Sequence, residues 1–117
     1  MSLNVKVFID AENVSPTEYK NKYEKKISRI LKENKLSSNS VEYRAYLVEN
    51  APQARNWYIY NVKDILIPGK PAKDKADKYI MNEMCDKANG KNICLLVTND
   101  KPFQNKVKKK LDNVIFP

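Results

Sequence analysis

The sequence has 117 residues, two cysteines, no histidine and a formal net charge of +8, and this length predicts one domain over residues 1–117. Without histidine there is no Ser-His triad or Cys-His zinc site, and two glycines are too few for a P-loop or a dinucleotide-binding turn. No apolar run approaches the roughly 20 residues of a membrane span, and two unpaired thiols, Cys85 and Cys94, suit the reducing cytoplasm. We therefore expect a cytoplasmic protein with no membrane partner, whose basic charge favours a polyanionic ligand.

The first predicted element is a strand that runs into a polar turn. Val5, Val7 and Ile9 alternate within an apolar, β-branched run that ends at Asp10, as in an inner strand. The turn that follows contains Glu12 and Asn13. Such a strand followed by a helix opens a β-α-β unit, in which ligands bind at the carboxyl ends of the strands.

The remaining elements follow from apolar periodicity, with a helix start marked by Ser15 as N-cap and Pro16 at the first helical position. In chain order they are a helix over 16–34, a strand over 41–48, a helix over 50–60, a short edge strand over 65–67, a helix over 75–88, a central strand over 93–97, a helix from 101 and a strand over 114–116. This order predicts a three-layer α/β/α fold of the Rossmann-like class, with a mainly parallel sheet of about five strands.

Three aspartates occupy equivalent positions in this arrangement. Asp10 and Asp100 follow the two most apolar strands, and Asp77 lies in the first turn of a helix. Strand ends of this kind meet in one crevice, where a divalent cation would relieve the repulsion between carboxylates. Oxygen ligands without histidine favour Mg²⁺ or Mn²⁺ over zinc. Two structural alternatives remain open, because Asp100 could cap the last helix and Asp77 could complement the dipole of its own helix.

At these residues the sequence resembles the NYN branch of the PIN-like ribonucleases. The segment Phe8-Ile9-Asp10-Ala11-Glu12-Asn13-Val14-Ser15-Pro16 is similar to the first motif of that family, an apolar strand ending in Asp, two variable residues and Asn. Lys75-Ala76-Asp77 is similar to the middle motif, and Glu83 lies where many members carry a further acid. Val97-Thr98-Asn99-Asp100 with Phe103 is similar to the last motif. The resemblance spans nearly the whole chain.

The resemblance implies a PIN-like sheet and Mg²⁺- or Mn²⁺-dependent cleavage of single-stranded RNA by an activated water. Asp10, Asp77 and Asp100 would then be both the catalytic and the metal-binding residues. The implied substrate-binding residues are those that orient water or phosphate oxygens and the lysines that attract the RNA backbone: Asn13, Thr98, Lys73, Lys75 and Lys101.

The sequence departs from the family at two positions, which keeps alternatives open. Many members carry a second acid near the last motif, where this chain has Pro102 and Gln104. The alternative is therefore a catalytically degenerate PIN-like domain that binds RNA or a protein partner without cleavage, and restoring an acid at either position is expected to tighten metal binding. A phosphatase of the haloacid-dehalogenase type ranks lower, because Glu12 replaces the second Asp that its chemistry needs. The RNA target and the oligomeric state, a homodimer included, stay open.

Overall fold

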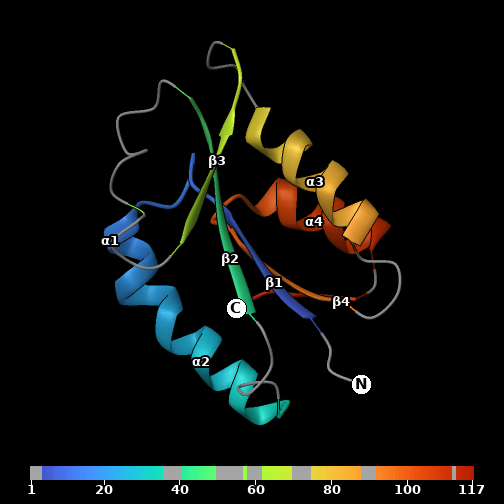
Figure 1. The fold of residues 1–117 in the computed structure, drawn as a ribbon. Coiled ribbons are helices and arrows are strands. Elements are labelled where there is room, and N and C mark those ends of the chain that lie inside the picture. The colour runs from blue at the N-terminus through green and yellow to red at the C-terminus, as the bar shows by residue number, and fades with distance from the viewer. Residues whose placement is uncertain are drawn as a thin grey trace.

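A five-stranded parallel sheet lies between helices on both of its faces (Figure 1). The computed structural model describes residues 4–35, 41–49, 57, 62–69, 75–87, 92–111 and 113–117. The strands are β1 (Asn4–Asp10), β2 (Val41–Val48), β3 (Lys63–Ile67), β4 (Asn92–Val97) and β5 (Val114–Ile115). The helical elements are α1 (Pro16–Glu18), the π-helical turn η1 (Tyr19–Tyr23), α2 (Glu24–Glu33), α3 (Lys75–Lys87) and α4 (Lys101–Lys110).

The strand order is β3-β2-β1-β4-β5, so β1 lies at the centre and β3 at an edge. This confirms the predicted three-layer α/β fold, and each described element begins and ends within about two residues of its predicted position. The helix predicted over 50–60 lies outside the described residues except for Trp57, which lies in a bend rather than a helix. Trp57 is buried against Tyr19, with ring centroids 5.6 Å apart. No helix in the described part of the chain combines the length and the apolar character needed to cross a bilayer.

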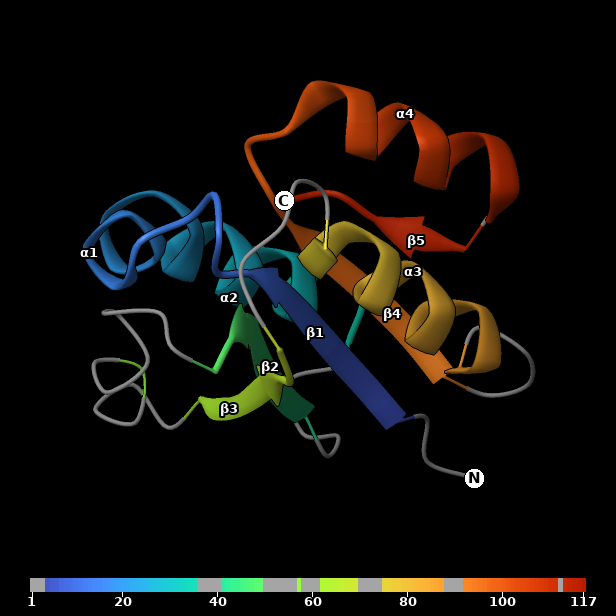
Figure 2. The same ribbon diagram turned by 90° about the horizontal axis from the view of Figure 1, so that it is seen from above.

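Each face of the sheet has its own apolar core, because side chains alternate along the strands. Val7 and Ile9 point to the face covered by α1, η1 and α2, where Ile27 and Leu31 are buried. Phe8 points to the opposite face, which α3 and α4 cover (Figure 2). Asp10, two residues after Phe8, therefore begins on the α3/α4 side at the carboxyl end of β1.

The first helical segment is not a regular α-helix. Ser15 caps it as predicted, its Oγ accepting from the backbone N–H of Glu18 at 3.1 Å, with Pro16 at the first position. The turn from Tyr19 to Tyr23 is π-helical, and both tyrosines are buried. Neither caps nor apolar periodicity marked this local change, at whose end Tyr23 contacts the residues that follow β4.

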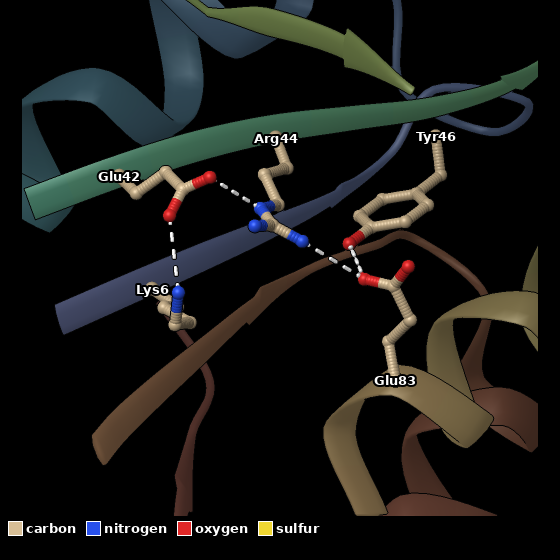
Figure 3. A network of polar contacts seen from close by, with 5 residues as sticks. All are labelled: Lys6, Glu42, Arg44, Tyr46 and Glu83. Carbon is tan, nitrogen blue, oxygen red and sulfur yellow. Dashed lines mark hydrogen bonds and ion pairs between the residues drawn. The ribbon is translucent and has the colours of Figure 1, made fainter. Parts of the chain in front are cut away.

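A polar network on the α3 side joins β1, β2 and α3 (Figure 3). The Glu42 carboxylate forms ion pairs with Lys6 Nζ at 3.0 Å and with Arg44 Nε at 2.6 Å. Glu83 of α3 pairs with Arg44 Nη1 at 3.0 Å and accepts a hydrogen bond from the Tyr46 hydroxyl at 2.5 Å. The hydrogen bond from Arg44 and the nearby Lys6 lower the pKa of Glu42 from its ordinary 4.5 to about 2. Arg44 is thus the cation that links β2 to α3.

Replacing Arg44 with methionine should lower the free energy of unfolding by about 1–3 kcal/mol at neutral pH, because two partly buried carboxylates lose their shared cation. The pKa of Glu42 is depressed in the fold, so its contribution is present above pH 4.5 and is lost as the pH falls towards 2. The difference in the free energy of unfolding between wild type and Arg44→Met, measured by urea denaturation, should therefore become smaller as the pH falls from 4.5 towards 2. Arg29→Met is the matched control on the exposed face of α2 and should change stability by no more than about 0.5 kcal/mol. Equal effects of the two substitutions would contradict the role given to Arg44.

Candidate active site

Asp10 is the most deeply buried acidic side chain among the described residues, with none of its surface exposed. Its Oδ2 accepts hydrogen bonds from Asn13 Nδ2 at 2.7 Å and from Thr98 Oγ1 at 2.8 Å. Its Oδ1 is equally buried and has no hydrogen-bond partner in the described part of the chain. Burial raises the pKa of Asp10 against hydrogen bonds from Asn13, Thr98 and the Glu12 backbone, and the negative charge of Asp100 raises it further. A carboxylate in this state is costly unless a cation or a proton compensates it.

The polar turn after β1 is held by its own residues. The backbone N–H groups of Asn13 and Val14 donate to the Asp10 carbonyl at 3.1 and 3.0 Å. Glu12 Oε1 accepts from the backbone N–H of Val48 at 2.9 Å and so fastens the turn to the end of β2. Glu12 thus has a structural role, while the Asn13 side chain is directed to the Asp10 carboxylate.

Asp100 lies at the end of the neighbouring strand and caps the last helix. Its Oδ1 accepts from the backbone N–H of Phe103 at 3.2 Å, so the capping alternative is realised. Its own N–H donates to Thr98 Oγ1 at 3.1 Å, and that hydroxyl in turn donates to Asp10. Thr98, itself buried, therefore joins the two strand-end aspartates.

Asp77 reaches this end of the sheet from α3. It is buried in the first turn of that helix and lines a pocket of about 270 Å³ between α3 and α4. Within the ranges that the structure describes, no group of three or more Asp, Glu or Cys side chains lies close enough to hold a metal ion. The structure links Asp10 to Asp100 through Thr98, and the three-carboxylate centre stays a prediction.

The predicted RNA-binding lysines are placed differently from one another. Lys73 lies outside the described residues, and Lys101 is exposed at the start of α4, next to Asp100. Lys75 lies close to the turn after β3. A Cβ atom placed on Gly69, whose φ is +99°, would be only 2.7 Å from Lys75 Nζ. Lys75 Nζ therefore lies beside the turn that follows the edge strand.

Sequence reasoning missed three residues that hold the end of β4. Asn99 Nδ2 donates to the Asn13 carbonyl at 3.2 Å and to Glu18 Oε1 at 2.8 Å, and Asn99 Oδ1 accepts from the Tyr23 hydroxyl. Gln104 Nε2 donates to the Thr98 carbonyl at 2.9 Å. The signal for Asn99 was its place between Thr98 and Asp100, whereas Tyr23 lies at the end of a π-helical turn that the sequence pattern did not mark.

Two positions that the family resemblance singled out, Gln104 and Glu83, carry side chains whose partners give them structural roles. Gln104, at a position where an acid was expected to help, uses its amide as a donor to the backbone. Glu83, at the place of a further acid, is already engaged by Arg44 and Tyr46 (Figure 3). Neither residue adds a carboxylate to Asp10.

Comparison with known proteins agrees with this arrangement. A family model described as the NYN domain matches residues 4–112, a span that contains both polar strand ends and α3. No curated protein and no solved structure gave a match. NYN domains are a branch of the PIN-like ribonuclease superfamily. Because the match covers nearly the whole sequence, the chain belongs to the NYN domain family.

Proposed function

We propose that this protein is a ribonuclease that uses Mg²⁺ or Mn²⁺ to cleave phosphodiester bonds of single-stranded RNA with an activated water. The family has a nuclease-type fold, which supports hydrolase chemistry in general. For this chain the proposal depends mainly on one observation: the carboxylate oxygen Asp10 Oδ1 is buried and has no hydrogen-bond partner among the described residues. We also propose a cytoplasmic location, because Cys85 and Cys94 are both free and suit a reducing compartment.

The residues at the strand ends fit a hard cation in their chemistry. We propose Asp10 as the principal ligand. The family resemblance, rather than their spacing in the structure, suggests Asp100 and Asp77 as further oxygen ligands, a set whose chemistry suits Mg²⁺ or Mn²⁺. A cation bound there supplies charge neutralisation at the phosphate and lowers the pKa of water. It would also offset the cost of burying Asp10, whose pKa is already raised by desolvation.

The chain's own side chains prepare this site. Asn13 and Thr98 both donate to Asp10 Oδ2 and so fix the plane of the carboxylate. We infer that Lys101 and Lys75, with Lys73, attract the phosphate backbone to the same edge of the sheet. In this proposal Asn13 and Thr98 act on RNA or water indirectly, because they fix the orientation of the Asp10 carboxylate.

The alternative is a degenerate domain that binds RNA or a protein without cleaving it. Two observations favour it: Pro102 and Gln104 replace the further acid, and no group of three acidic or thiol side chains suited to a metal exists among the described residues. Metal binding and cleavage, measured separately, decide between the two functions.

Millimolar Mn²⁺ should raise the melting temperature of the wild type, because it binds the folded state alone. At tenfold over Kd this linkage gives about 1.4 kcal/mol, or roughly 4–8 °C for a domain of this size. Asp10→Asn should abolish the shift and leave the metal-free melting temperature equal or higher, since it removes a buried charge. Glu12→Gln makes the same carboxylate-to-amide change two residues along the chain and keeps an acceptor for the Val48 N–H. It should therefore keep the Mn²⁺-induced shift. A wild-type melting curve that ignores Mn²⁺ would contradict the metal site.

Wild type and Glu12→Gln should cut a labelled single-stranded RNA in the presence of Mn²⁺, and Asp10→Asn should lose at least about a hundredfold in rate, because it removes the principal ligand. Denaturing electrophoresis of the products is the measurement. Equal cleavage by Asp10→Asn would identify a contaminating nuclease. Mn²⁺ binding without cleavage by any preparation would establish the degenerate alternative.

The structure separates the two substitutions that would restore an acid. Pro102 is exposed at the start of α4, so Pro102→Asp adds a carboxylate near Asp100 at little structural cost. We expect it to tighten Mn²⁺ binding in calorimetric titration. Gln104→Asp instead removes the donor to the Thr98 carbonyl and should weaken Mn²⁺ binding and lower stability by about 1 kcal/mol. The reverse order of the two variants would contradict the positioning of Thr98 by Gln104.

A further inference from the structure

A pocket of about 270 Å³ opens between α3 and α4, next to the candidate site. It is lined by Asp77, Lys78, Met81, Asn82, Phe103 and Lys106. Figure 2 shows the two helices that form its walls on the same side of the sheet. The pocket is therefore a feature of packed helices rather than of a loop.

The floor of the pocket is apolar and belongs to the core. Phe103 is only 2 % exposed, and Met81 packs against the same cluster, which includes Phe8 and Ile80. A floor anchored in this way is formed before a ligand arrives, which reduces the entropy lost on binding.

The rim of the pocket is polar and basic. Asn82 is exposed, and its amide can both donate and accept hydrogen bonds. Lys78 and Lys106, from opposite helices, are exposed cations. A flat apolar group with a polar edge, attached to a negatively charged chain, matches this combination.

The pocket also lies beside Asp100. Asp77 lines it, and the backbone N–H of Phe103 is bonded to Asp100 Oδ1 at 3.2 Å. A nucleotide whose phosphate lies beside Asp100 would thus have its base, or that of its neighbour, within reach of the pocket.

We propose that this pocket binds one base of single-stranded RNA, with Asn82 contacting the base edge and Lys78 and Lys106 holding the flanking phosphates. The inference rests on the proposed function for its ligand class, but it requires RNA binding and not cleavage. It assigns base preference to the pocket between α3 and α4, which shares Asp77 with the aspartate site.

The test uses the full chain carrying Asp10→Asn, without metal, so that no RNA is cut. The probes are fluorescent homopolymers of A, C and U, and a ribose-phosphate chain of equal length without bases, followed by fluorescence anisotropy. At least one homopolymer should bind about five- to tenfold more tightly than the abasic chain, as expected for one base contact. Asn82→Ala should remove most of that difference and leave the affinity for the abasic chain unchanged.

Asn105→Ala is the matched control, an exposed asparagine on α4 that does not line the pocket, and it should preserve the base preference. Urea denaturation establishes that each variant is folded. Equal binding of the abasic and base-bearing chains, or an equal effect of Asn82→Ala on all probes, would overturn the inference. A complete lack of RNA binding would overturn it too and make a protein the occupant to seek.

The outcomes for the pocket and for the enzyme are separable. Metal-dependent cleavage by the wild type without any effect of Asn82→Ala on base preference leaves the ribonuclease proposal standing and refutes the pocket. Base preference that depends on Asn82, without cleavage, supports the pocket and replaces the enzyme by the degenerate, RNA-binding alternative.

Discussion

The hydrogen bond from Thr98 Oγ1 to Asp10 Oδ2, at 2.8 Å and fully buried, is the contact on which the candidate site depends. It joins the ends of β1 and β4, the central neighbours in the sheet, at the point where both strands turn into polar segments. A buried carboxylate is tolerated only where donors replace the lost water. Thr98 and Asn13 satisfy one oxygen of Asp10 and leave the other unpartnered within the described structure. This asymmetry is what makes Asp10 a ligand candidate rather than a structural acid.

Thr98 can orient the Asp10 carboxylate because its own backbone carbonyl and hydroxyl are fixed by hydrogen bonds. Its carbonyl accepts from Gln104 Nε2, and from the Tyr23 hydroxyl at 3.4 Å, while its hydroxyl accepts from the Asp100 N–H. Residues from η1, the β4 end and α4 therefore converge on Thr98, two of them on its backbone carbonyl and one on its hydroxyl. Changes in the first turn of α4 should reach Asp10 through it, since each bond restricts the orientation of the next.

The sequence predicted the sheet and the positions of the strand ends well, because both depend on local patterns. The apolar alternation of β1, the Ser15 cap and the apolar run of β4 are properties of consecutive residues. The contacts of Asn99 and Gln104 could not be predicted in the same way, because they join residues of different elements through single side-chain atoms. The π-helical turn was missed because a helix with one wider turn keeps nearly the same apolar spacing. Asp100 shows the remaining difficulty, since the same sequence pattern predicts a helix cap and a metal ligand.

The hydrogen bonds of the two strand-end aspartates bear on how many ions such a site would take. Asp10 Oδ2 already serves two donors, and Asp100 Oδ1 already caps α4. Asp10 Oδ1 is the carboxylate oxygen there that is both buried and unpartnered within the described residues. Two ions close together need bridging and terminal carboxylates from several residues, whereas Gln104 offers an amide donor and Glu83 is committed to Arg44 and Tyr46. If the proposed cation binds, the partners of the Asp10 and Asp100 oxygens would therefore favour a single ion held mainly by Asp10 Oδ1.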